Sequence, residues 1–166
     1  MTEAVNAGID TIVVDFSVNL GYFANIENVT LQGNNTVSAI GNNLDNVIIG
    51  NDGNNYISGG AAGNNTLTGG AGSDSFAFNF SAASFDVITD FVNGIDHLFT
   101  GDYLVPFVSG AGMTSGDGTN QIIYDTNTGY LYYENGLNAD AAVHVATLLG
   151  IPTLSESDFY HNPPPV

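Results

Sequence analysis

Residues 41–77 read GNNLDNVII GNDGNNYIS GGAAGNNTLT GGAGSDSFA, with a break before each glycine that opens a unit. The units are nine residues long, except the third, which has ten. An apolar residue occupies the eighth position of each unit, or the ninth of the longer one, and an Asn or Asp lies two residues before it. The apolar residues are Ile48, Ile57, Leu67 and Phe76, and the polar residues are Asn46, Asn55, Asn65 and Asp74.

This period predicts a stack of short parallel strands. Nine residues provide one strand and one tight turn, so two units make one coil of a flattened helix of strands. A single unit cannot bury its apolar side chain alone, and the coils must therefore stack. Glycines supply turn positions with positive φ, where a Cβ would clash. The Asn and Asp side chains then point into the turn stack, where they and the turn carbonyls can form an oxygen cage between coils.

The last unit, residues 69–77, matches the nonapeptide G-G-x-G-x-D-x-U-x at every fixed position. In this motif the chain resembles RTX proteins, whose hemolysin-type repeats bind calcium. Residues 84–98 resemble the segment that closes such rolls. Residues 124–136 and 146–159 resemble the C-terminal target region of type I secretion substrates. The resemblance implies an all-β protein built around a right-handed parallel β-roll.

Three segments are expected along the chain. They are N-terminal strands leading into the roll in residues 1–32, the RTX-like roll with its closing segment in residues 33–98, and a β-rich capping region in residues 99–166. Within the cap, residues 122–124 and 130–133 flank a turn and predict an antiparallel hairpin. The Ala- and Leu-rich residues 139–149 predict one short helix.

The resemblance also implies a set of calcium ligands. The Asp of the family motif is a ligand, and this role carries over to Asp74. Asp90 and Asp86, in the sequence DVITD, are implied as ligands of the last coil's ion. Turn carbonyls and Asn side-chain oxygens complete the expected site. The full set is Asp74, Asp90, Asp52, Asp86, Asn55, Asn65, Gly69, Ala71 and Gly50.

Each of these assignments has an alternative. Asp74 could cap a turn through an Asx-type hydrogen bond instead of binding an ion. Asn55 and Asn65 stand where the family carries Asp, and such Asn columns could form a hydrogen-bonded ladder between turns. Asp45 and Asp96 are expected to be surface or turn residues rather than ligands.

The charge balance excludes several classes of partner. The chain of 166 residues has no Lys or Arg and 17 Asp plus Glu, which gives a formal charge of −17. Nucleic-acid binding needs cations that contact phosphates, and an anionic membrane surface would repel this chain. No apolar run is long enough to span a membrane. Because no strong cation of the chain can pair with these carboxylates, an external cation is expected, and oxygen-preferring divalent ions fit best.

An enzyme is not expected. The chain has no Cys and none of the common motifs for a catalytic zinc, a serine nucleophile or a phosphate loop. His97, His144 and His161 are far apart in the sequence. Several tyrosines could instead form an exposed adhesive patch that stacks on sugars, or a core face with cross-strand pairs. These tyrosines are Tyr124, Tyr130, Tyr132 and Tyr133.

The functional expectation is a secreted bacterial protein, extracellular or on the cell surface, that folds on binding calcium. Its strands begin in mid-pattern, and an open stack of this kind could be continued by another copy in head-to-tail fashion. That arrangement predicts a matrix, surface-layer or filament subunit exported by type I secretion machinery. One alternative is the C-terminal secretion and folding module of a larger toxin, protease or epimerase. A second alternative is a carbohydrate-binding adhesin module.

Overall fold

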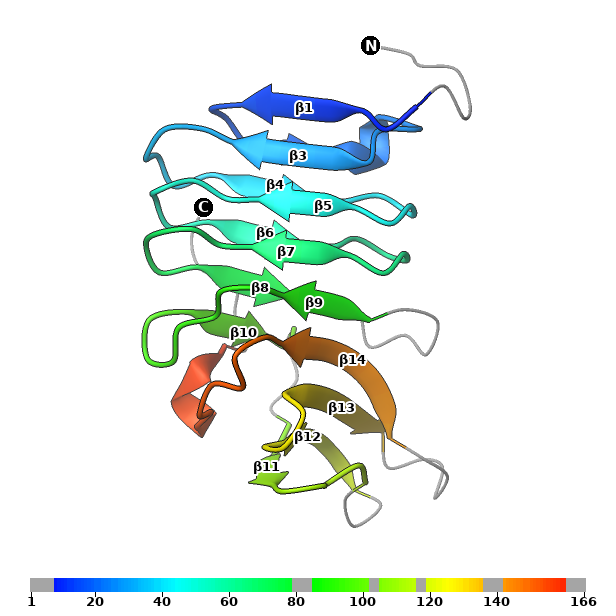
Figure 1. The fold of residues 1–166 in the computed structure, drawn as a ribbon, viewed down its shortest axis with the longest axis vertical. Coiled ribbons are helices and arrows are strands. Elements are labelled where there is room, and N and C mark those ends of the chain that lie inside the picture. Colours follow the sequence, from blue (N-terminus) through cyan, green and yellow to red (C-terminus); the bar gives the residue numbers. More distant parts are fainter. Residues whose placement is uncertain (1–7, 79–84, 102–104, 116–118, 136–141, 161–166) are drawn as a thin grey trace.

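The computed structural model describes residues 8–78, 85–101, 105–115, 119–135 and 142–160. Its main body is a parallel β-solenoid of about five turns, and no α-helix occurs in these ranges (Figure 1). Each turn contributes one strand to each of two facing sheets. The repeat pattern therefore predicted the all-β class and the stacking of parallel strands, and both are confirmed.

Odd-numbered strands of the solenoid form one sheet and even-numbered strands form the other. The first sheet contains β1 (Thr11–Val14), β3 (Asn28–Leu31), β5 (Val47–Ile49), β7 (Thr66–Thr68) and β9 (Asp86–Ile88). The second contains β2 (Val18–Asn19), β4 (Ser38–Ile40), β6 (Tyr56–Ser58), β8 (Ser75–Ala77) and β10 (His97–Phe99).

The register between coils follows the repeat length. Ser38 of β4 pairs with Tyr56 of β6, an advance of two nonapeptides. Val47 of β5 pairs with Thr66 of β7, one residue further, because the ten-residue unit lies between them. The extra residue is thus absorbed in a turn, and the inward-facing positions of the strands stay aligned.

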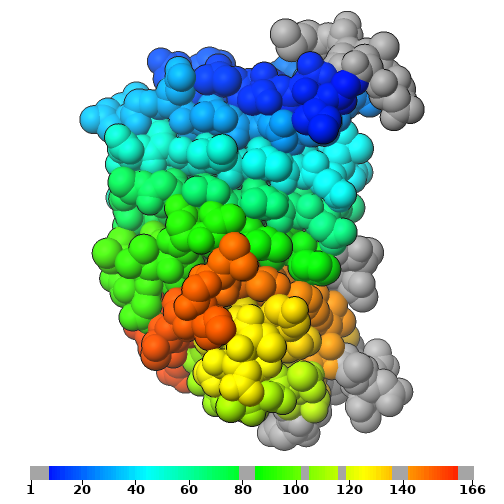
Figure 2. All heavy atoms as spheres, viewed as in Figure 1, coloured from blue at the N-terminus to red at the C-terminus, as the bar shows by residue number. Residues whose placement is uncertain are grey.

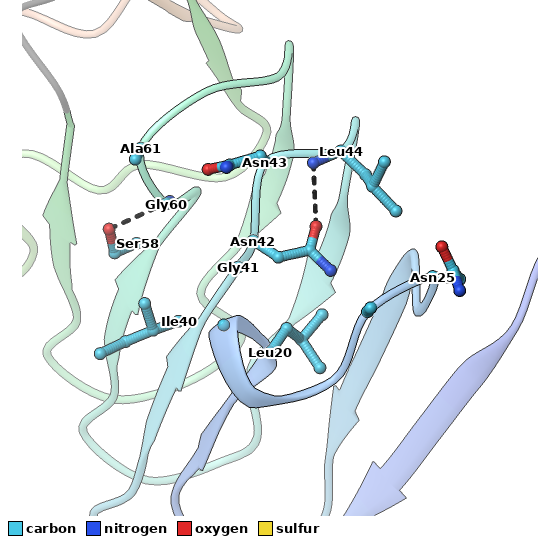
Figure 3. A pocket seen from close by; sticks show the side chains of 12 residues that line it. Leu20, Asn25, Ile40, Gly41, Asn42, Asn43, Leu44, Ser58, Gly60 and Ala61 are labelled. Carbon is cyan, nitrogen blue, oxygen red and sulfur yellow. Dashed lines mark hydrogen bonds between the residues drawn. The ribbon is translucent and has the colours of Figure 1, made fainter. Parts of the chain in front are cut away.

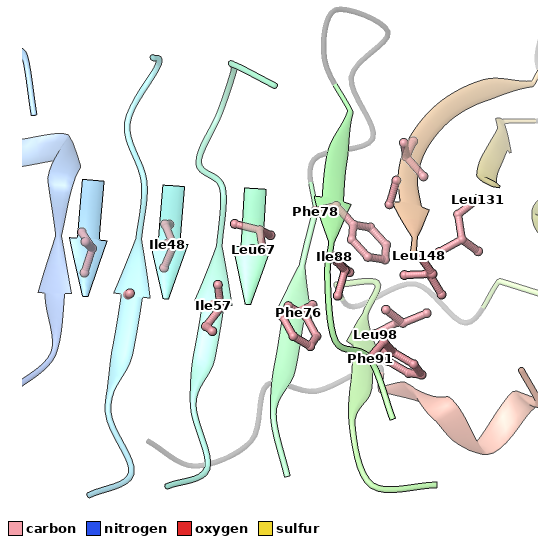
Figure 4. Packing of buried hydrophobic residues seen from close by; sticks show 14 of the residues in the cluster. Ile48, Ile57, Leu67, Phe76, Phe78, Ile88, Phe91, Leu98, Leu131 and Leu148 are labelled. Atoms are coloured by element: carbon pink, nitrogen blue, oxygen red, sulfur yellow. The ribbon is translucent and has the colours of Figure 1, made fainter. Parts of the chain in front are cut away.

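The core is a double column of apolar side chains between the two sheets. In most of the three-residue strands the central side chain points inward, because side chains alternate along a strand, whereas in β9 the inward apolar residue is Ile88 at the third position. Ile48, Ile57, Leu67 and Phe76, which the period singled out, are all 0% exposed (Figure 4). Full burial of one such side chain contributes about 1.5–3 kcal/mol, so stacking is what makes each coil stable.

The C-terminal part continues the first sheet and closes the end of the solenoid. Strand β14 (Val143–Leu148) pairs in parallel with β9, and β13 (Tyr130–Asn135), β12 (Asn120–Asp125) and β11 (Phe107–Gly110) follow in that order. In the second sheet, β15 (Phe159–Tyr160) pairs with β10. The rings of Phe107 and Phe159 lie 4.8 Å apart and join the two sheets there. Figure 2 shows this C-terminal part packed beneath the last coils.

The expected hairpin of residues 122–124 and 130–133 is confirmed as the antiparallel pair β12 and β13. The helix expected over residues 139–149 is wrong. Residues 143–148 form β14, and residues 139–141 lie outside the described part of the chain. The free edges of β9 and β13 both pair with this segment, and the β-branched Val143, Val145 and Thr147 suit a strand. The described helices are the three-residue 3-10 turns η1 (Leu20–Tyr22) and η2 (Glu156–Asp158).

Candidate metal-binding turns

Two stacks of turns connect the sheets. The Asp74 stack contains residues 50–55, 69–74 and 89–96, which lead from the first sheet to the second. The Asn65 stack contains residues 41–46 and 59–65, and Asp86 continues it at the start of β9. Alternate repeat units lie on the same side, so seven of the expected ligand residues share the Asp74 stack. These are Gly50, Asp52, Asn55, Gly69, Ala71, Asp74 and Asp90, whereas Asn65 and Asp86 lie in the other stack.

The inward Asn and Asp side chains of the Asp74 stack form a ladder between coils. The backbone N–H of Asn55 donates to Oδ1 of Asp74 at 2.8 Å. The backbone N–H of Asp74 in turn donates to Oδ1 of Asp96 at 2.9 Å. Hydrogen bonds therefore link successive coils at these positions, and the carboxylates satisfy turn amides that have no strand partner.

The Asn65 stack repeats the ladder with amides. The N–H of Asn46 donates to Oδ1 of Asn65 at 2.8 Å, and Nδ2 of Asn65 donates to Oδ1 of Asp86 at 2.7 Å. Asp86 is buried. Burial raises the pKa of its carboxyl to about 6, although the hydrogen bonds from Asn65 lower it. This stack therefore stabilises its buried carboxylate, that of Asp86, with neutral donors.

Asp74 has the least satisfied carboxylate of the described residues. Its side chain is 0% exposed, and Oδ2 has no hydrogen-bond partner in the part of the chain that the structure describes. Burial raises the pKa of Asp74 to about 7, the hydrogen bond from Asn55 lowers it, and the charges of Asp96 and Asp90 raise it further. A buried oxygen without a partner is costly when it is charged, so this position favours a proton or an added cation.

A glycine is required beside each inward side chain. A Cβ added to Gly69 would lie 2.3 Å from Oδ2 of Asp74. Cβ atoms added to Gly41 and Gly50 would lie 2.5 Å from the Oδ1 atoms of Asn46 and Asn55, respectively. The glycine that opens each unit thus makes room for the Asn or Asp later in the same unit.

The carboxylate of Asp90 binds two backbone amides of the turn that carries Asp74. Its Oδ1 accepts the N–H of Gly69 and its Oδ2 accepts the N–H of Gly70, both at 2.8 Å. The side chain therefore lies next to the turn that carries Asp74. Both oxygens remain able to accept further contacts, because each carboxylate oxygen has two lone pairs.

Asp96 was expected to be a surface or turn residue, and it is a turn residue that is buried. Its side chain is 3% exposed, and its Oδ2 accepts the N–H of Val92 at 2.8 Å. Burial raises its pKa. The burial of Asp96 could have been predicted from its spacing, because Asp96 lies two residues before the inward Leu98, as Asp74 does before Phe76. Asp45 is exposed as expected, and its Oδ1 accepts the N–H of Asn64 at 2.8 Å.

Asp52 lies on the outside of the same stack. It is exposed and lines a shallow groove of about 520 Å³ together with Gly50 and Gly70. Among the described residues no three His, Cys, Asp or Glu side chains converge closely enough to hold a metal ion by themselves. Calcium can take its oxygens from backbone carbonyls as well as carboxylates. A cation in the Asp74 stack would therefore depend on turn carbonyls in addition to Asp74 and Asp90.

The aromatic residues divide between core and surface. Tyr124 is 0% exposed and donates its hydroxyl to the carbonyl of Pro152 at 2.8 Å, so it belongs to the core. Tyr130 and Tyr132 lie on one face of β13 with their rings 6.3 Å apart. His144 stacks on Phe85 at 4.6 Å and contacts Tyr130 at 4.5 Å, and burial lowers its pKa. These rings pack against one another from β13, β14 and the residue before β9, so His144 lies on a strand and not on the helix that was expected around it.

No family model matches the chain, and no curated protein does. The likeness to RTX proteins therefore rests on the repeat residues, and its implications for calcium and export are proposals. In the described ranges no helix is long and apolar enough to cross a membrane.

Proposed function

We propose that this chain is a secreted calcium-binding structural protein whose solenoid is stabilised by calcium in the Asp74 stack. The observation that carries the proposal is Oδ2 of Asp74, a buried carboxylate oxygen without a partner in the described structure. The chain has no Lys or Arg to neutralise it, and the carboxylates of Asp90 and Asp96 are close enough to raise its pKa. An added cation removes both costs at once.

Asp74 and Asp90 would hold the ion, with backbone carbonyls of the repeat turns at Gly69 and Ala71 as further oxygens. Calcium supplies positive charge to a cluster that otherwise repels itself. Its binding free energy then adds to the free energy of folding. The reason is that the turns that carry Asp74 and Asp90 meet only when the coils are stacked. Extracellular calcium modules need affinities of only about 10⁻⁴–10⁻³ M. A chain of this kind stays less ordered where calcium is scarce and gains order after export.

The structural role includes assembly. The first coil forms an end of the solenoid in the described part of the chain, because β1 and β2 are terminal strands of the two sheets, and Phe16 between them is 60% exposed. Head-to-tail stacking on another copy would cover such an end and would propagate, as heterologous contacts do. Export by type I secretion machinery before folding fits the same scheme. The competing proposal, a secretion and folding module of a larger protein, predicts calcium-dependent folding without assembly.

Calcium titration of the purified chain separates these outcomes. Far-ultraviolet circular dichroism, urea unfolding and light scattering are followed from chelator to about 10 mM calcium, which exceeds the expected affinity range. The proposal predicts a higher urea midpoint together with a rise in particle mass. A stabilised monomer would favour the secretion module, and an unfolding midpoint that calcium leaves unchanged would refute the calcium site. Magnesium at the same concentration controls for charge screening, because it fits flexible carbonyl-rich sites poorly.

A further inference from the structure

A second site lies on the side of the Asn65 stack, among the first three coils, and shares no residue with the Asp74 stack. It is a groove of about 640 Å³ between η1 and the turns that follow β4 and β6. Figure 3 shows these three segments around the groove, with Leu20 and Ile40 on one side and Asn43 and Leu44 on another. Its volume lies within the range of small-molecule sites, about 300–1,000 Å³.

The groove is uncharged in a strongly acidic protein. None of the 12 residues that line it is Asp or Glu, although the chain has 17 of them. The surrounding net charge repels anionic ligands, and the absence of carboxylates from the lining gives a cation no partner there. Because anionic and cationic ligands are both disfavoured, the groove suits an uncharged ligand.

Its walls combine apolar carbon with available polar groups. Ile40 and Leu44 provide the accessible apolar part, because Leu20, although it borders the groove, is 0% exposed. The side-chain amide of Asn43 is exposed and has no hydrogen-bond partner among the residues that the structure describes, so it can both donate and accept. The hydroxyl of Ser58 accepts the N–H of Gly60 at 3.3 Å, which leaves its own proton to donate.

The wall itself is held rigidly. Nδ2 of Asn42 donates to the carbonyl of Ile26 at 2.9 Å, and its Oδ1 accepts the N–H of Leu44 at 2.9 Å. A Cβ added to Gly41 would lie 2.3 Å from the carbonyl oxygen of Gly59, so the two turns are in close backbone contact. A ligand therefore meets a preformed surface, and little ordering entropy is lost on binding.

We propose that this groove binds a neutral saccharide. A sugar ring presents apolar C–H groups on its faces and hydroxyls at its rim, which matches apolar walls beside an amide and a hydroxyl. A purely apolar ligand would leave Asn43 and Ser58 without partners, at a cost in free energy. The rings of Tyr130, Tyr132 and His144 are a weaker candidate, because they pack against one another. The proposal goes beyond the calcium-dependent structural role and does not require it.

The test uses the full chain in calcium-containing buffer. An array of neutral oligosaccharides is screened beside sialylated forms of the same glycans, and the best neutral glycan is then titrated by calorimetry. We expect neutral glycans to bind and their sialylated forms to bind less. Asn43→Ala should weaken binding by about threefold to tenfold, the value of one hydrogen bond. Ala61→Trp should block the groove, since Ala61 is an exposed lining residue.

Asn34→Ala is the matched control, because Asn34 is an exposed Asn of the earlier GNN sequence, residues 33–35, and does not line the groove. Its affinity should equal that of the unmodified chain. The proposal is overturned if no neutral glycan binds at millimolar concentration, or if Asn43→Ala binds as tightly as the Asn34→Ala control. If Ala61→Trp fails to fold by circular dichroism, the Asn43→Ala titration alone decides. If calcium did not stabilise the unmodified chain, the proposed structural function would fail. The glycan affinities would still decide whether the groove binds a saccharide.

Discussion

Replacing Asp74 with Asn should stabilise the calcium-free protein at neutral or alkaline pH. The side chain is fully buried, and its pKa is raised from an ordinary value near 3.8 to about 7. The folded state therefore binds a proton that the unfolded chain releases near pH 4, and stability falls as the pH rises from about 4 to 7. At 1.36 kcal/mol per pKa unit, the charged carboxylate costs at most about 4 kcal/mol at pH 8.

An Asn at this position keeps the shape and removes the charge. Its Oδ1 can still accept the N–H of Asn55. A precedent for its Nδ2 is Asn65, whose Oδ1 accepts the N–H of Asn46 of the earlier coil while its Nδ2 donates to the carbonyl of Gly63 at 3.2 Å. The gain should be largest at pH 8 and should nearly vanish at pH 4, where Asp74 is protonated. The proposed calcium site predicts the reverse order in calcium, because an Asn at position 74 would bind the ion more weakly than Asp74 does.

Urea unfolding followed by circular dichroism measures this effect at pH 4, 6 and 8, in chelator and in calcium. Asp15→Asn, at an exposed position in the first coil, controls for the change in net charge. The reasoning is refuted if Asp74→Asn is less stable than the unmodified protein at pH 8 in chelator. A stability difference that does not shrink toward pH 4 would refute it as well.

Two further predictions concern the repeat itself. Gly69→Ala should destabilise the fold by about 1–3 kcal/mol, because its Cβ would lie 2.3 Å from Oδ2 of Asp74 and 3.0 Å from the ring of Phe76. Urea unfolding measures this loss, and an unchanged midpoint would contradict the close packing around Gly69. Ile57→Ala should cost about 2–5 kcal/mol, since the side chain is 0% exposed in the core. Ile49→Ala, on an outward position that is 41% exposed, should stay within about 0.5 kcal/mol, and equal losses in the two variants would argue against the assigned strand faces.

The period of nine was enough to predict the solenoid. Each unit contains its own strand, its own glycine turn and its own inward side chain, so the information is local and repeats along the chain. Ile48, Ile57, Leu67 and Phe76 were identifiable as core residues for this reason. The hairpin of β12 and β13 was predictable on similar grounds, because the turn and both strands are contiguous.

Tertiary structure decided what depends on distant segments. Residues 139–149 have enough Ala and Leu to suggest a helix, yet residues 143–148 pair with both β9 and β13 as a strand, and strand edges that need partners outweigh a weak helical propensity. The partnerless oxygen of Asp74 and the burial of Asp96 arise only when coils about 20 residues apart are stacked. The uncharged groove likewise combines η1 with two later turns. Composition predicted the need for an external cation, but which carboxylate lacks a partner follows from how the coils pack.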